Sequence, residues 1–214
     1  MLCSLVIFQS CFDIVEQVFI KQDGSGNFQI TLNFSKSKTK LNSMMKMKTV
    51  NGHPVPSQQE IKDRVAGIEK SVAKIGGISQ VKSQLDFDNF IATFSCSFSK
   101  VNQLNLAVQK INAEEKGNKE NVGNLFQHDN QQKTFSRLNT LSLKKEYDKM
   151  TSADREIFTG ASYTTIYKFE QSVVSVSNAA AKVAPSKKAV LLRQNVLDII
   201  TNKKNIDNKI QLSN

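Results

Sequence analysis

Residues 12–34 read FDIVEQVFIKQDGSGNFQITLNF, and this stretch decides the fold class. Ile14, Val18 and Ile20 precede the segment Asp23–Gly26, and apolar side chains follow it at every second position, with polar side chains between them. A period of two is the period of a β-strand with one buried face. The glycines supply the positive φ angles that a tight turn needs. The stretch therefore predicts a β-hairpin.

The same alternation returns at residues 81–98, where Asp88 and Asn89 mark the turn of a second hairpin. A helix is predicted between the two hairpins, because Ser57 and Glu60 form a capping box and Gly76 and Gly77 end the pattern. Its apolar side chains fall at steps of three and four, at Ile61, Val65, Ile68, Val72 and Ile75. Ser99 predicts the cap of a further helix, with apolar side chains at Val101, Leu104, Val108 and Ile111.

The order of these elements predicts an α+β fold, in which an antiparallel sheet built from hairpins carries two or three helices on one face. Strand-like stretches resume later in the chain, at residues 134–138, 162–169, 173–176, 189–192 and 206–212. We therefore divide the chain into a leader (1–10), an α+β hairpin and helix domain (11–111), a polar loop or insertion (112–132) and a strand-rich C-terminal part of the same fold (133–214).

The net charge of +10 favours anionic partners. The lysines are scattered, however, and the four arginines are not interleaved with aromatic residues as a nucleic-acid groove requires. This distribution argues against nucleic acid as a partner. It leaves anionic lipid, acidic glycan or a plain solvated surface as interpretations.

The first ten residues, MLCSLVIFQS, form a short apolar run that ends in a small serine before Cys11. The run is too short to span a bilayer and is typical of the apolar region of a signal peptide. The order resembles the lipobox of bacterial lipoproteins, in which a cysteine thiol receives the lipid anchor. Phe8, Gln9 and the missing basic residue before the run depart from that pattern, and a buried first strand is the alternative.

Three pieces of the chain together resemble exported bacterial lipoproteins of the LppM-like domain family, which includes many members from the Bacteroidota. The pieces are Cys11, the segment 19–34 with its Asp-Gly-Ser-Gly turn, and the run YTTIYKFEQSVVSVSN at 163–178. The resemblance concerns the order of elements over about two thirds of the chain. It implies an α+β domain attached to a membrane and facing the periplasm or the cell exterior. The family carries no agreed catalytic residues, so none is transferred.

No catalytic, cofactor or metal constellation is predicted. His53 and His128 lie far apart in the sequence, without the ligand spacings of a metal site. The chain has no Gly-x-Ser-x-Gly nucleophile elbow and no phosphate-binding loop. Cys96 shares a strand face with two phenylalanines, which predicts a buried structural thiol.

The stretch Met44-Met45-Lys46-Met47-Lys48 is the most unusual local feature. Methionine lines adaptable apolar surfaces, and lysine meets anionic head groups. An apolar ligand would enter between the sheet and its helices, near Phe28, Phe34 and Phe94, with Met44, Met45 and Met47 in the wall and Lys46 and Lys48 at the rim. A short helix that closes a filled core is the alternative.

These observations predict a non-enzymatic, lipid-anchored binding or structural module of the bacterial cell envelope, without a cofactor. Its expected contacts are the membrane, through Cys11, and an anionic lipid or glycan. The alternative is an envelope hydrolase whose active site cannot be recognised from the sequence.

Overall fold

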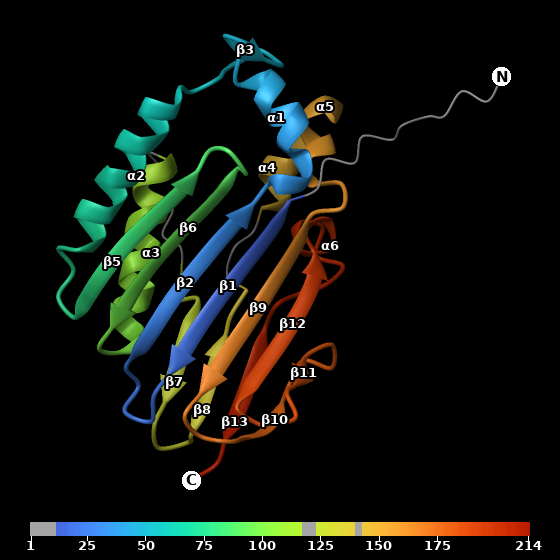
Figure 1. The fold of residues 1–214 in the computed structure, drawn as a ribbon. Helices are drawn as coiled ribbons and strands as arrows, with labels where there is room; N and C mark the ends of the chain where they lie inside the picture. Colours follow the sequence, from blue (N-terminus) through green and yellow to red (C-terminus); the bar gives the residue numbers. More distant parts are fainter. Residues whose placement is uncertain (1–11, 117–122, 140–142) are drawn as a thin grey trace.

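The computed structural model of the protein describes residues 12–116, 123–139 and 143–214. Its main element is a seven-stranded sheet, called here the large sheet, with strand order β11-β12-β9-β1-β2-β6-β5 (Figure 1). In that order the strands are β11 (Lys182–Val183), β12 (Ala189–Asn195), β9 (Ser162–Phe169), β1 (Asp13–Ile20), β2 (Gly26–Asn33), β6 (Ile91–Phe98) and β5 (Ile78–Asp86). Neighbouring strands are antiparallel, except that β1 and β9 pair in parallel.

Both predicted hairpins are confirmed, as β1–β2 and β5–β6. In the first turn, the Asp23 carboxylate accepts hydrogen bonds from the backbone amide and the hydroxyl of Ser25, at 2.9 and 2.7 Å. Gly24 has a φ of +83°. A β-carbon on Gly26 would lie 1.9 Å from the Phe19 carbonyl oxygen, so only glycine fits there.

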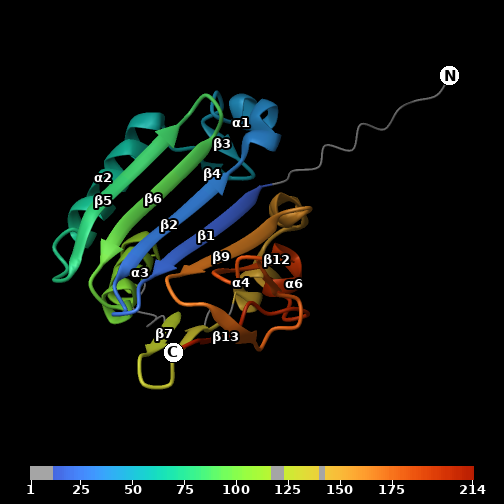
Figure 2. The ribbon, with the colours of Figure 1, turned by 60° about the horizontal axis from the view of Figure 1, so that its bottom comes forward.

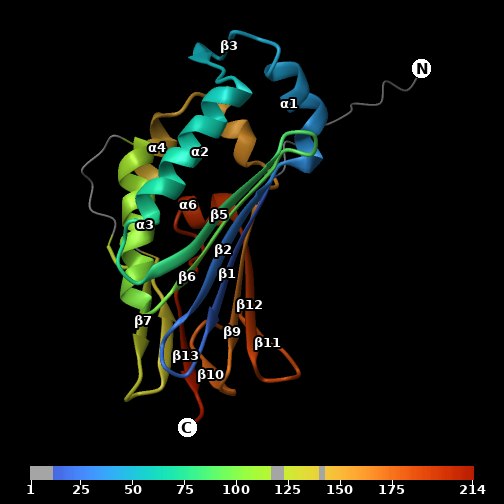
Figure 3. The same cartoon turned by 60° about the vertical axis from the view of Figure 1, so that its left-hand side comes forward.

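A second layer covers one face of the large sheet and has two parts. The helices α2 (Gln58–Val72) and α3 (Val101–Lys116) cover the β5–β6 side. A four-stranded antiparallel sheet, called here the small sheet, lies on the same side as the helices (Figure 3) and beside β9 and β12 rather than β5 (Figure 2). Its strands, in spatial order, are β10 (Val173–Val176), β13 (Asn208–Leu212), β8 (Thr134–Arg137) and β7 (Phe126–Asp129).

The predicted α+β class, with helices on one sheet face and a strand-rich C-terminal part, is confirmed by this arrangement. The remaining elements are short: α1 (Lys38–Met44), β3 (Thr49–Val50), β4 (His53–Pro54), α4 (Lys144–Lys149), α5 (Ser152–Arg155) and α6 (Val196–Ile200), with 3-10 turns at Ser35–Ser37 and Glu156–Phe158. Within the described residues, no helix is long and apolar enough to cross a membrane.

The capping box that predicted α2 is present. The Ser57 hydroxyl accepts a hydrogen bond from the Glu60 amide at 3.2 Å, and the Glu60 carboxylate accepts one from the Ser57 amide at 2.7 Å. These bonds satisfy two backbone amides at the start of the helix, which would otherwise have no partner within the helix. They therefore fix the residue at which α2 begins.

The polar range 112–132, expected to be a loop or insertion, contains regular structure. The helix α3 continues to Lys116, and Phe126–Asp129 forms β7. Polar composition misled the sequence interpretation here, because a four-residue strand at a sheet edge needs only one or two apolar side chains. Phe126 supplies that contact and is 1% exposed.

The main core lies between the large sheet and the second layer. It combines Val18, Phe28 and Phe98 of the large sheet with Leu104 of α3 and Phe135 of the small sheet. Aromatic rings pack through it, for example Phe135 against Tyr167 with ring centroids 5.2 Å apart. The core is therefore rich in phenylalanine.

Candidate functional site

The packing between α2 and the large sheet loosens from one end to the other. Val72, at the C-terminal end of α2, is completely buried, whereas Ile61, Val65 and Ile68 nearer its start are only half-buried. The inner side chains of the sheet follow the same trend. Phe98 of β6 is 3% exposed, but Ala92, at the other end of that strand, is half-buried. The helix and the sheet therefore diverge toward the end of the molecule where α1 lies (Figure 3).

Two adjoining hollows occupy this space, which we call the apolar wedge. The inner hollow measures about 380 Å³ and the outer hollow about 250 Å³. Leu85 and Ala92 line both. The inner hollow is lined by Ile30, Leu32, Val65, Ile68, Ser83, Leu85, Ala92, Thr93, Phe94 and Ile111, and the outer by Phe34, Leu41, Met45, Ile61, Leu85, Asp86, Phe87, Phe90, Ile91 and Ala92.

Ser83 is the one hydroxyl-bearing side chain of β5 that faces α2 between the apolar Val81 and Leu85. Its Oγ is buried and has no hydrogen-bond partner within the described part of the chain. An unpaired buried hydroxyl costs about 1–3 kcal/mol. A polar atom of a bound molecule or of a water in the wedge would remove that cost.

Two lysines lie near the outer mouth of the wedge, at the turn between β5 and β6. The Lys62 ammonium of α2 lies 5.5 Å from the ring centroid of Phe87, which forms part of the mouth. The Lys38 ammonium at the start of α1 lies 3.5 Å from Oδ1 of Asn89, in the β5–β6 turn. Asp86 is also at the mouth, but its carboxylate accepts two hydrogen bonds from Asn89, at 2.9 and 2.8 Å, and these hold its pKa below the ordinary value.

The predicted ligand-facing residues are distributed unevenly around the wedge. Met45 lines the outer hollow, and Met44 is half-buried. Met47 is 53% exposed, and Lys46 and Lys48 are exposed beyond the end of α1.

Of the three phenylalanines, Phe34 and Phe94 line the wedge, whereas Phe28 belongs to the filled core. Sequence reasoning missed Ser83, although a hydroxyl on the apolar side of an alternating strand is a visible signal. Cys11, the predicted lipidation site, lies outside the described residues.

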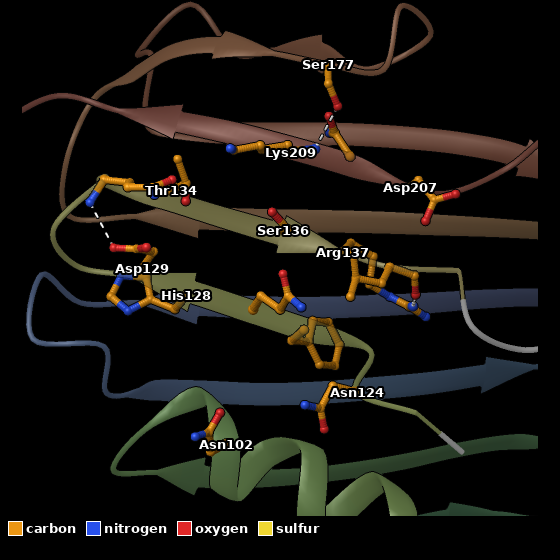
Figure 4. A pocket seen from close by; sticks show the side chains of 15 residues that line it. Asn102, Asn124, His128, Asp129, Thr134, Ser136, Arg137, Ser177, Asp207 and Lys209 are labelled. Carbon is orange, nitrogen blue, oxygen red and sulfur yellow. Dashed lines mark hydrogen bonds between the residues drawn. The ribbon is translucent and has the colours of Figure 1, made fainter. Parts of the chain in front are cut away.

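A second, larger hollow of about 710 Å³ lies at the small sheet (Figure 4). Thr134 and Ser136 of β8 contribute hydroxyls to it, and Lys209 of β13 contributes an ammonium. Asp129 lines it as well, and its Oδ1 accepts hydrogen bonds from the backbone amides of Gln131 and Gln132. A polar sheet face of this kind is suited to water.

Two charged side chains, Glu16 of β1 and Arg137 of β8, are deeply buried. They form an ion pair, and both are less than 5% exposed. The guanidinium donates to both carboxylate oxygens, at 3.0 and 3.1 Å. The hydroxyls of Tyr163 and Tyr167 each donate to the same carboxylate at 2.6 Å. Burial, reinforced by the Glu16 charge, raises the pKa of both tyrosines. Burial by itself lowers the pKa of Arg137, but the Glu16 carboxylate outweighs this effect and raises that pKa well above the ordinary value.

This cluster joins the two sheets and has its polar atoms satisfied. A catalytic group would instead need a free proton-accepting or nucleophilic atom at a cavity. Each oxygen of Glu16 has two donors, so the cluster acts as a polar clamp between β1, β8 and β9.

The two histidines are not organised for catalysis. Nε2 of His53 lies 3.8 Å from Asp154 on the surface. His128 packs against Gly24, and burial lowers its pKa. Among the described residues, no hydrogen bond links either imidazole to a hydroxyl or thiol nucleophile, and no group of three or more His, Cys, Asp or Glu side chains could hold a metal. Cys96 is 3% exposed, and burial raises its thiol pKa to about 11.

Comparison with known proteins adds one structural likeness. No family model and no curated protein sequence matches the chain. The solved structure of the folded domain of Mycobacterium tuberculosis LppM is similar, with a TM-score of 0.40 and 12% identity over 98% of this chain and 92% of that domain. A likeness of this degree assigns neither family nor function.

Proposed function

We propose that the protein is a binding module that holds the aliphatic chain of an amphiphilic molecule in the apolar wedge. The observation that carries the proposal is the wedge itself: two connected apolar hollows beneath a half-buried helix stripe. Ligand sites are typically apolar cavities of about 300–1,000 Å³ with a few polar groups. The inner hollow, of about 380 Å³, falls in that range.

The wall of the wedge favours an alkyl chain over a polar ligand. Its side chains come from β2, β5, β6, α1, α2 and α3, and nearly all are aliphatic or phenylalanine. Burying a methylene group in such surroundings contributes about 0.8 kcal/mol. A chain of several methylene groups that crosses both hollows would cover side chains that are now only half-buried.

The test is native mass spectrometry of delipidated protein after incubation with hexadecanoate. We expect one bound molecule per chain. Ser83→Leu occupies part of the inner hollow in the path of the alkyl chain and should abolish the adduct. The matched control is Ser95→Leu on β6, whose side chain faces away from α2. Binding that survives in a folded Ser83→Leu variant, or an absence of any adduct with the wild type, would contradict the proposal.

We further propose that the module is lipid-anchored at Cys11 in a bacterial cell envelope. The first strand begins at Asp13, and Phe12 packs against Phe34 with ring centroids 5.1 Å apart. Because Phe34 lines the wedge, an anchor at Cys11 would place the wedge mouth at the membrane. Expression of the full-length gene with a clickable palmitate tests this. Labelling of Cys11→Ser to the level of wild type would rule out Cys11 as the anchor.

A further inference from the structure

We infer that the ligand of the apolar wedge is an anionic amphiphile, and that Lys38 and Lys62 hold its head group at the outer mouth. The inference rests on the proposed function, because it assumes that an alkyl chain occupies the wedge. What it adds is the class of head group and the residues that select it.

The position of the two ammonium groups supports this assignment. Two different helices bring them to one turn, Lys62 against the Phe87 ring and Lys38 beside Asn89. A head group whose alkyl chain lies between Phe34 and Phe90 would emerge at the same turn, since both rings line the outer hollow.

The nearby carboxylates have hydrogen-bond partners of their own, and Asp86, which stays ionised, also interacts with the charge of Lys38. Neither Lys38 nor Lys62 forms an ion pair with a carboxylate of the described residues. Asp86 is held by Asn89 at 2.9 and 2.8 Å, Glu60 by the Ser57 cap at 2.7 Å, and Asp63 by Gln59 at 2.8 Å.

The sequence around α1 also raises the local positive potential. Between Ser35 and Val50 the chain carries five lysines and no acidic residue. Positive charge at the rim of an apolar opening attracts anions and repels cations. A neutral head group would gain nothing from it.

The experiment compares dodecanoate with dodecan-1-ol, which share a chain and differ in head-group charge, by titration calorimetry at low salt and pH 8. We expect the wild type to bind dodecanoate about tenfold more tightly, as two partly exposed charge contacts allow. In Lys38→Gln/Lys62→Gln the two affinities should become nearly equal, with dodecan-1-ol affinity unchanged. The control Lys70→Gln/Lys74→Gln, in the last turn of α2 and just beyond its C-terminal end, should keep the preference.

The possible failures are distinguishable. Equal binding of the two probes by the wild type, or a preference that persists in Lys38→Gln/Lys62→Gln, overturns the head-group assignment and leaves the wedge as an apolar site. If neither probe binds the folded wild type, the proposed function fails, and the inference fails with it.

Discussion

At the scale of single residues, the Glu16 cluster marks the limit of what the sequence can predict. The alternation in residues 12–20 places position 16 on the same face as Val18 and Ile20, so a charged residue there is a visible anomaly. Its partner Arg137 lies 121 positions away, and nothing local indicates that pairing. Pairings over such distances depend on the topology of the whole chain.

Arg137→Met is expected to destabilise the protein by about 3–5 kcal/mol, because it leaves the Glu16 carboxylate buried without its cation. Glu16→Gln/Arg137→Met should recover part of this loss, since the amide carries no charge. Urea unfolding measures both, with Arg193→Met as the control, because the Arg193 side chain is 60% exposed. A loss below about 1 kcal/mol for Arg137→Met would contradict a buried charge pair.

His128 should make stability depend on pH in mild acid. Burial lowers its pKa in the folded state below the ordinary 6.5, so the unfolded state binds more protons below that value. The stability that the protein gains from keeping His128 neutral is fully present above pH 6.5, and it is lost as the pH falls through the pKa of His128 in the folded state. Carboxylates titrate later, from ordinary values of 3.8 and 4.5.

Wild type should therefore lose stability relative to His128→Gln when unfolding is measured at pH 7.5, 6.5 and 5.5. The exposed His53→Gln serves as the control. If the pH profiles of wild type and His128→Gln stay parallel over this range, the burial of His128 has no energetic consequence.

At the scale of elements, α2 shows what periodicity can and cannot predict. The capping box and the apolar stripe located the helix and its inner face correctly. Periodicity gives the direction of a face but not its distance from a neighbour. The stripe therefore predicted a packed helix, whereas only Val72 of α2 is fully buried. Ser83 on β5 was the local sign of a gap on the opposite wall.

Ser83→Leu should stabilise the ligand-free protein by about 1–3 kcal/mol, because it removes an unpaired buried hydroxyl and fills part of the inner hollow. Ser95→Leu, on the solvent side of the sheet, should change stability by less than about 0.5 kcal/mol. Both are measured by urea unfolding of delipidated protein. A destabilised Ser83→Leu variant would mean that the inner hollow has no room for the two additional heavy atoms of the leucine side chain.

Removing the α2 cap tests whether the capping hydrogen bonds hold the first turns of that helix in place. Ser57→Ala should cost about 1 kcal/mol, because the Glu60 amide loses its acceptor. Amide hydrogen exchange should rise first in the opening turns of α2, around Ile61. Unchanged exchange there would show that packing against β5, and not the cap, holds the start of the helix.

At the scale of the whole molecule, local patterns predicted the elements better than their arrangement. Hairpins and helices depend on neighbours in sequence, so β1–β2, β5–β6, α2 and α3 could be found. The parallel pairing of β1 with β9 joins Asp13 to Ser162, and the small sheet joins Ser136 of β8 to Lys209 of β13, and no pattern in any of these segments specifies the partner. The wedge lies between α1, α2, α3 and the strands β2, β5 and β6, and periodicity does not give the spacing between these elements, which is why only its Phe, Met and Lys candidates could be proposed beforehand.

A ligand that binds only the folded wedge must stabilise the entire fold. At a free concentration one hundred times Kd, the gain is about 2.7 kcal/mol. Thermal unfolding should therefore shift upward with hexadecanoate in wild type and in Ser95→Leu, and should not shift in Ser83→Leu. A shift of equal size in all three proteins would place the binding site outside the wedge.

The most direct test of the central claim is photo-crosslinking of a hexadecanoate analogue with a diazirine near the end of its alkyl chain, followed by peptide mapping. The account predicts that the labelled peptides come from the walls of the inner hollow, in α2 around Val65 and Ile68 and in β5–β6 around Leu85 and Phe94. Unlabelled hexadecanoate should compete with that labelling. Labelling that concentrates on the small sheet or on the open face of the large sheet, or that does not compete, would contradict the claim that the wedge holds an alkyl chain.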